Sequence, residues 1–303
     1  MKKKNFLRFS ILAIALFFTA GYGLFKSEPG FLYASSKAKE EVKLDVPFEP
    51  SEMEVVGEML KISQVNKDDV VYDLGCRDGR IVITAVQKTG ARGVGVDLDP
   101  QRIQESVENA RRAGVAERVE FLRQDLFQTD FRQATVVMLY LWPEVNLRLR
   151  PKLLKELKPG TRVVSHSHDM GNWETDKTIT APNGHKVHFW VIPANVGGIW
   201  EWDMPGSKEK QRWVLRLQQQ FQKVQGTLQA ESREIPLKDL EVKGAWLQFS
   251  AENEVKGQTQ KIRFIGRVKD HLLEGTLEET DAGAPFKQNW IARRDPASYI
   301  PWE

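Results

Sequence analysis

Between residues 51 and 165, short apolar runs alternate with segments in which apolar residues recur every three or four positions. The runs at residues 70–74, 93–97, 118–122, 135–141 and 161–165 predict buried strands. The segments at residues 80–88, 99–114 and 145–157 predict helices between them. This order is typical of an α/β domain built on a parallel sheet. Two further runs, at residues 185–193 and 197–202, predict an antiparallel pair that closes the sheet.

Two helix starts carry capping signals. Ser51 and Glu54 have the spacing of a capping box, so a helix is predicted to begin there. Its buried face is predicted to contain Met53, Val56, Met59 and Leu60. Asp99 and Pro100 are predicted to be the cap and first residue of a later helix.

Beyond residue 205 the apolar period changes to two, and no long helical segment occurs. The tripeptide Gly226-Thr227-Leu228 recurs as Gly275-Thr276-Leu277, which indicates repeated hairpins in a meander or small barrel. The aromatic residues of this part are expected to form its core rather than a binding site. The chain is therefore divided into an N-terminal segment (1–45), an α/β domain (46–204) and an all-β domain (205–303).

The N-terminal segment contains an uncharged run from Phe9 to Phe25, preceded by MKKKNFLR. At about 17 residues this run is at the lower limit of a membrane span and longer than a typical signal-peptide core. Since no clear small-x-small cleavage site follows, we favour an uncleaved membrane anchor over a cleaved signal. Basic residues flank the run on both sides, so the positive-inside rule does not fix its orientation.

Charge and cysteine content exclude some classes. The net charge of +3 gives no reason to expect a nucleic-acid partner, which calls for a basic stripe on one face. The single cysteine excludes an internal disulfide framework.

The segment DVVYDLGCRDGR, residues 69–80, predicts a strand, a tight turn and a helix start. Gly75 and Gly79 allow the backbone to lie close to a ligand. The next strand ends at Asp97, where a carboxylate can accept hydrogen bonds from both hydroxyls of a ribose. A dinucleotide is disfavoured, because the glycines do not follow G-x-G-x-x-G and because Asp73 and Asp78 would repel a pyrophosphate. The pattern favours a cationic, nucleoside-bearing cofactor.

These motifs resemble those of class I S-adenosylmethionine-dependent methyltransferases. Six segments in order are similar to the ATP synthase c-subunit lysine methyltransferase family and its bacterial relatives: VPFEPSEMEVV, VVYDLGCRDGRIVI, GVGVDLDP, QDLF, LYLWPEVN and LKPGTRVVSHSHDMGNW. The resemblance covers residues 46 to about 173 and does not extend into the all-β part. It implies a Rossmann-like class I methyltransferase sheet with an appended C-terminal all-β domain.

The resemblance also implies a set of residues around S-adenosyl-L-methionine. Asp97 would hold the ribose, Asp125 the adenine amino group, and Leu126 would lie beside the adenine ring. The remaining positions implied are Phe48, Asp73, Gly75, Asp78 and Gly79. The chain departs from the family at Arg77, where a glycine is usual, so a positive φ at this position would strain the backbone. Cys76 also replaces what is usually a small residue.

Residues of the acceptor site are expected at the carboxyl edge of the sheet, where open α/β sheets bind ligands. Tyr140, Trp142 and Glu144 follow one predicted strand, and His166 and Asp169 follow the next. The rings of Tyr140 and Trp142 favour a cationic centre. Glu144, His166 or Asp169 would relay a proton, and the sequence does not rank them.

The histidines also raise the question of a metal. His166 and His168 share one face of a segment predicted to be extended, beside Asp169. No third ligand lies at a recognisable spacing, so no metal site is predicted.

The sequence thus predicts a membrane-tethered methyltransferase whose substrate is a lysine on a membrane protein. The alternatives are methylation of a small molecule such as a quinone or lipid, or an exported binding protein with a relic methyltransferase fold. An intracellular cofactor favours a catalytic domain that faces the cytoplasm. The oligomeric state is not indicated.

Overall fold

The computed structural model describes residues 51–205, 211–255, 258–279 and 286–302. The predictions for Phe48 and for the N-terminal hydrophobic segment therefore lie outside the described residues. Within the described ranges, no helix has the length and apolar character needed to cross a membrane.

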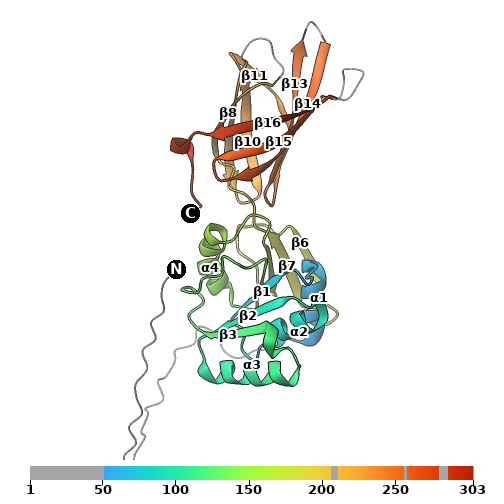
Figure 1. Cartoon of the computed structure of the whole chain (residues 1–303), viewed down its shortest axis with the longest axis vertical. Coiled ribbons are helices and arrows are strands. Elements are labelled where there is room, and N and C mark those ends of the chain that lie inside the picture. The colour runs from blue at the N-terminus through green and yellow to red at the C-terminus, as the bar shows by residue number, and fades with distance from the viewer. Residues whose placement is uncertain (1–50, 206–210, 256–257, 280–285, 303) are drawn as a thin grey trace, which may run out of the picture. The chain divides into compact units, whose positions relative to one another are not determined.

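The first sheet has seven strands in the order β3-β2-β1-β4-β5-β7-β6 (Figure 1). Its strands are β1 (Val70–Leu74), β2 (Arg92–Asp97), β3 (Val119–Arg123), β4 (Val136–Leu139), β5 (Arg162–His166), β6 (Lys177–Thr180) and β7 (Lys186–Val191). The first five are parallel, and β7 pairs antiparallel with β5 and β6. The order reverses between β1 and β4, so both strands end at the point where ligands bind in such sheets.

Helices cover both faces of this sheet. They are α1 (Met53–Ser63), α2 (Arg80–Thr89), α3 (Pro100–Arg112) and α4 (Pro143–Glu156). Residues of α1 and α2 pack on Val71, Val136 and Met138, whereas α4 packs on Leu74, Val137 and Leu139. Successive strand residues point to opposite faces, which explains why continuous apolar runs form these strands.

Of the two helix caps predicted from the sequence, the structure contains one. Asp99 caps α3 by accepting the Gln101 N–H, and Pro100 is its first residue, as predicted. The predicted capping box of α1 is wrong: Glu52 occupies the cap position without a side-chain bond, and the Ser51 hydroxyl contacts His166 instead. Met53, predicted to be buried, is 53% exposed.

The second sheet is antiparallel and has nine strands in the order β11-β10-β9-β8-β16-β15-β14-β13-β12. Its strands are β8 (Gly198–Asp203), β9 (Arg212–Gln220), β10 (Lys223–Ala230), β11 (Arg233–Ile235), β12 (Leu237–Lys243), β13 (Trp246–Val255), β14 (Gln258–Lys269), β15 (Leu272–Glu279) and β16 (Phe286–Arg294). Strand β12, at one end of the order, also lies close to β10 near the other end, so the sheet nearly closes. The expected meander or small barrel is confirmed.

The prediction that the run at residues 197–202 closes the first sheet is wrong. Strand β8 pairs instead with β9 and β16 of the second sheet. Strand β6, which sequence analysis missed, takes the predicted place beside β7. An alternating strand pattern fixes which side chains are buried but not which strand is its partner.

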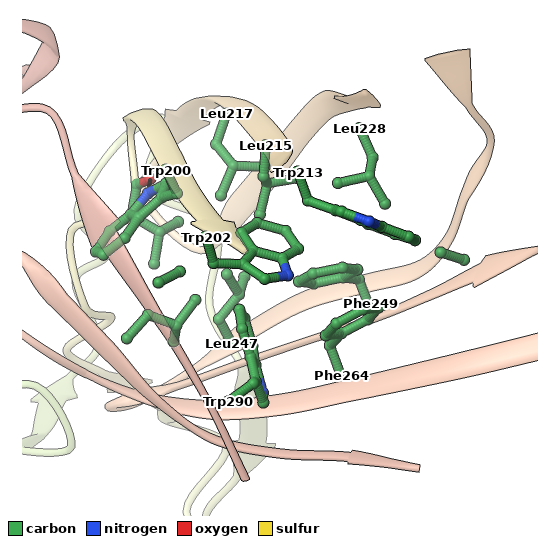
Figure 2. Close-up of a cluster of buried hydrophobic side chains, with 14 of the residues drawn as sticks. Trp200, Trp202, Trp213, Leu215, Leu217, Leu228, Leu247, Phe249, Phe264 and Trp290 are labelled. Atoms are coloured by element: carbon green, nitrogen blue, oxygen red, sulfur yellow. Dashed lines mark hydrogen bonds between the residues drawn. The ribbon is translucent and has the colours of Figure 1, made fainter. Parts of the chain in front are cut away.

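Aromatic side chains fill the interior of the second sheet. Figure 2 shows them packed around Trp202: the cluster includes Trp200, Trp213, Phe249, Phe264 and Trp290. Phe249 and Phe264 stack with ring centroids 4.7 Å apart, and Trp290 meets Phe249 edge-on at 88°. Such geometries suit the ring quadrupoles. These aromatics form the core, as the sequence predicts.

The repeated Gly-Thr-Leu tripeptides occupy equivalent places in two hairpins. Gly226 of β10 pairs with Leu217 of β9, and Gly275 of β15 pairs with Gly266 of β14. A Cβ at Gly226 would lie 2.0 Å from the Arg216 carbonyl oxygen, and one at Gly275 would lie 1.9 Å from the Ile265 carbonyl oxygen. Each glycine therefore permits a close approach of two strands that a side chain would prevent.

We expect Gly275→Ala to lower the free energy of unfolding of the β domain by at least about 1–3 kcal/mol, the usual cost of overpacking. Gly57→Ala is the matched control, because a Cβ there meets no atom within 4 Å. In the interior of α1 this change should raise stability by about 0.5–1 kcal/mol. Urea unfolding followed by tryptophan fluorescence measures both. Equal stability of Gly275→Ala and the wild type would contradict the close strand approach.

Candidate functional site

The loop after β1 forms one wall of the candidate site. Gly75, Arg77 and Gly79 have φ values of 83°, 52° and 77°. A Cβ at Gly79 would lie 2.9 Å from the Phe121 ring. Arg77 thus has the positive φ that would strain a residue with a side chain, and it adopts a conformation that glycine takes more readily.

Cys76 packs inside this loop and is buried. Burial, followed by the nearby charges of Asp73 and Asp97, raises the pKa of its thiol well above the usual value. A thiol that stays protonated is a weak nucleophile, so Cys76 serves packing.

Asp97 lies at the end of β2, opposite the loop. One carboxylate oxygen accepts the Arg77 backbone N–H at 2.9 Å, and the other accepts the Asp99 backbone N–H at 2.9 Å. Both oxygens keep a further lone pair for another donor. The carboxylate is thus oriented by the backbone and remains half-exposed at the site.

Asp73 is the most unusual residue of the site. Its side chain is 1% exposed, and its Oδ2 has no hydrogen-bond partner among the described residues. Burial, together with the charges of Asp97 and Asp78, raises its pKa to about 8, against a backbone hydrogen bond from Val82 and the charge of Arg77. A buried carboxylate in this state favours a cationic hydrogen-bond donor.

Three further cofactor candidates, Asp78, Asp125 and Leu126, have contacts within the protein. The Asp78 carboxylate pairs with Arg80, with Nη2 and Oδ2 2.6 Å apart, which balances its charge. Asp125 accepts the Phe127 N–H at 2.9 Å and so shapes the turn after β3, while Leu126 packs on the core beside it.

The acceptor candidates divide into two groups. Tyr140 stacks on His166, with ring centroids 3.9 Å apart and an interplanar angle of 24°. Trp142 precedes α4 and is 47% exposed. Glu144 and Asp169 lie on the surface, and the Asp169 carboxylate accepts the Gly171 N–H. The structure therefore brings Tyr140 and His166 together and leaves the two carboxylates exposed.

Sequence analysis missed the partners of His166. Its Nδ1 lies 2.9 Å from Ser51 Oγ, and its Nε2 lies 2.7 Å from His185 Nδ1. Burial, followed by the neighbouring His185 and His168, lowers the pKa of His166 to about 4, against the opposite effect of Glu52. No sequence signal identifies Ser51, because its position before a helix reads as a cap.

The prediction that His166 and His168 lie on an extended segment is wrong. Ser167 between them has a φ of 64°, so the chain turns there. Among the residues that the structure describes, no group of three histidine, cysteine, aspartate or glutamate side chains is placed to bind a metal.

Residues 73–177 match the ANTKMT methyltransferase domain. A protein-lysine N-methyltransferase from Saccharolobus islandicus is 44% identical over 151 residues, which are 48% of this chain and 94% of that protein. The chain belongs to the protein-lysine N-methyltransferase family.

Two further proteins are similar to the methyltransferase. The ATP synthase c-subunit lysine N-methyltransferase of Mus musculus is 30% identical over 205 residues, 66% of this chain and 76% of that protein. A solved structure described as an RNA methyltransferase from Salinibacter ruber with S-adenosyl-L-homocysteine is 46% identical, covers 54% of this chain and all of that one, and has a TM-score of 0.47. The predicted family, the class I fold with its appended β domain and the enzymatic class are confirmed.

The methyltransferase uses S-adenosyl-L-methionine, and its site fits that cofactor. The Oδ2 of Asp73, which has no partner among the described residues, is free to accept a hydrogen bond from a cation such as the cofactor's ammonium group. The oriented carboxylate of Asp97 has lone pairs left for hydroxyl donors. When bound, the cofactor supplies an activated methyl group on a sulfonium.

We expect Asp73→Asn to change how stability depends on pH in the unliganded protein. The pKa of Asp73 is about 8 in the folded protein, against an ordinary value of 3.8. Between these pH values the folded protein keeps a proton that the unfolded chain releases, so wild-type stability falls as pH rises from about 4 to about 8. The advantage of Asp73→Asn should grow over that range, measured by urea unfolding. Asp169→Asn, at an exposed carboxylate, is the control, and a pH-independent advantage of Asp73→Asn would show that Asp73 is ionised throughout.

Proposed function

We propose that the methyltransferase transfers methyl groups to a lysine side chain of a membrane protein. The observation that carries this proposal is the match with a relative named as a lysine N-methyltransferase of the ATP synthase c-subunit, over 76% of that protein. A second relative from Mus musculus, 28% identical over 180 residues, is named adenine nucleotide translocase lysine N-methyltransferase. Both names refer to a lysine acceptor on another protein.

The N-terminal sequence supports a membrane location. The uncharged run from Phe9 to Phe25 is flanked by lysines that can extend to lipid headgroups. Attachment of this segment would hold the catalytic domain near the bilayer and raise its effective concentration towards membrane substrates. We place the catalytic domain on the cytoplasmic side, where the cofactor is made.

Six described residues are proposed to hold the cofactor. Asp73, Gly75 and Gly79 would surround the methionine end, since they lie at the end of β1 or in the turn after it, and the Asp73 Oδ2 has no described hydrogen-bond partner. Asp97 would accept the ribose hydroxyls. Asp125 and Leu126 would contact the adenine, in line with their place after β3.

The acceptor lysine must lose a proton before it attacks. Its ordinary pKa is about 10.4, so it is an ammonium at neutral pH. Desolvation against Tyr140 and Trp142, together with the like charge of the sulfonium, would lower that pKa. The nitrogen lone pair then forms the N–C bond while the C–S bond breaks. Positioning and desolvation account for most of this catalysis, and no covalent intermediate is required.

We expect Asp97→Ala to weaken binding of S-adenosyl-L-methionine by about 10- to 100-fold, because charge-assisted hydrogen bonds contribute roughly 1.5–3 kcal/mol. Asp99→Ala is the matched control. It removes a neighbouring carboxylate that caps α3, so it should cost about 1 kcal/mol of stability and leave affinity unchanged. Isothermal titration calorimetry measures both affinities. Equal affinity of Asp97→Ala and the wild type would remove Asp97 from the cofactor site.

The acceptor is tested with membranes from cells that lack this chain. Purified full-length enzyme and labelled cofactor should add mass in steps of one methyl group to a lysine of a membrane protein, as read by mass spectrometry. Asp97→Ala at low cofactor concentration is the control for background labelling. Label found only in lipid, quinone or RNA would refute the lysine acceptor and leave the methyltransferase assignment intact.

A further inference from the structure

A chain of three side chains connects the start of α1 with the hairpin of β6 and β7. Ser51 Oγ lies 2.9 Å from His166 Nδ1, and His166 Nε2 lies 2.7 Å from His185 Nδ1. Ser51 and His166 are buried, at 3% and 1% exposure, whereas His185 is half-buried. The chain therefore leads from the interior of the domain towards solvent.

Both ring nitrogens of His166 are hydrogen-bonded, and this limits how its protons can be arranged. A neutral imidazole has one N–H donor and one acceptor nitrogen. Either Ser51 donates to Nδ1 while Nε2–H donates to His185, or both bonds run the opposite way. The direction of one hydrogen bond thus sets the direction of the other.

His166 itself remains neutral at physiological pH, because burial and its neighbours lower its pKa to about 4. A proton that enters the chain is therefore not retained on His166. When Nδ1 of His166 receives a proton from Ser51, its Nε2 proton passes to His185, and His166 changes tautomer without becoming charged.

Other ionisable groups surround this chain. Glu52, which accepts a hydrogen bond from Asn183, precedes α1, and Lys186 adjoins His185 on β7. His168 lies on the other side, with its ring centroid 6.4 Å from that of Tyr140. His188 bonds elsewhere, to Thr178 Oγ1 and the Ser167 carbonyl.

The chain also adjoins the proposed acceptor site. The Tyr140 ring covers the His166 ring at a centroid distance of 3.9 Å, and Tyr140 directly follows β4 at the carboxyl edge of the sheet. The Arg80 guanidinium, next to the cofactor loop, donates to the Ser51 carbonyl at 3.1 Å. Ser51 therefore contacts His166, beside the proposed acceptor site, and Arg80, beside the cofactor loop.

We propose that Ser51, His166 and His185 form a proton path that carries the proton of the acceptor ammonium to solvent. This inference rests on the proposed lysine acceptor. The ammonium gives one proton to the Ser51 end of the chain, one proton leaves His166 for His185, and His185 releases it to water. The neutral amine then takes the methyl group from the sulfonium, which becomes a thioether.

The kinetic test uses His185→Ala in the full-length enzyme, because a half-buried side chain near the surface is removed and space is created for a small base. We expect kcat to fall by about 10- to 100-fold, within the range of proton-transfer catalysis. The KM for S-adenosyl-L-methionine should be unchanged, and added imidazole should restore kcat in proportion to its concentration. His188→Ala, three residues further along the chain in β7, is the matched control and should keep wild-type kcat. An unchanged kcat in His185→Ala, or a loss that imidazole does not restore, would overturn the path and leave a structural cross-link.

A second measurement is independent of activity. The chain has five histidines, so 15N spectra of their rings can be assigned with single variants. In spectra recorded over a range of pH, a proton on Nδ1 of His185 would make this nitrogen the donor to Nε2 of His166, so the protonated nitrogen of His166 should switch from Nε2 to Nδ1. Ser51→Ala should alter this switch. A His166 tautomer that does not respond to His185 overturns the path even where lysine methylation is found. A normal switch in a protein that methylates no lysine overturns the acceptor and, with it, the role of the path.

Discussion

The site depends on a carboxyl group, that of Asp73, buried at the end of β1. Asp73 is shielded from solvent, lies near Asp78 and Asp97, and leaves one oxygen without a partner among the described residues. Asp78 is balanced by Arg80, and Asp97 by two backbone N–H groups, but no described residue gives Asp73 a comparable balance. Such a carboxylate is expensive to ionise until a cation arrives. The unliganded protein therefore keeps a proton on Asp73 up to a pH of about 8, and a cation bound beside it would take the place of that proton.

Arg77 shows how this chain departs from a glycine-rich loop. A left-handed conformation costs a residue with a Cβ roughly 1–2 kcal/mol. The same residue contributes the charge that lowers the pKa of Asp73, against the larger effect of burial. Its backbone N–H also orients Asp97. The substitution thus combines local strain with a positive charge near two carboxylates.

Whether a feature of the structure can be predicted depends on how far apart in the sequence its interacting residues lie. The parallel strands and the positions of all four helices follow from local patterns, because burial on both faces leaves continuous apolar runs and a helix buries every third or fourth residue. The prediction places β8 in the wrong sheet, because its alternating apolar and polar residues fit either sheet. Ser51 is misread because a hydroxyl before a helix is usually a cap, whereas here it bonds a histidine 115 positions away. Interactions of this kind leave no periodic trace in the sequence.

The neutral histidine chain and the exposed carboxylates have a common physical explanation. A carboxylate beside the acceptor lysine would stabilise its ammonium form and raise its pKa, which opposes methyl transfer. Glu144 and Asp169 lie on the surface, while the group next to Tyr140 is an imidazole held uncharged by burial. A neutral relay accepts a proton on one nitrogen as it gives one up on the other, so no lasting charge forms within the site. Under the proposed lysine acceptor, the group that stacks on Tyr140 therefore carries no fixed charge, whereas the two carboxyl groups Asp73 and Asp97 lie close together at the ends of β1 and β2.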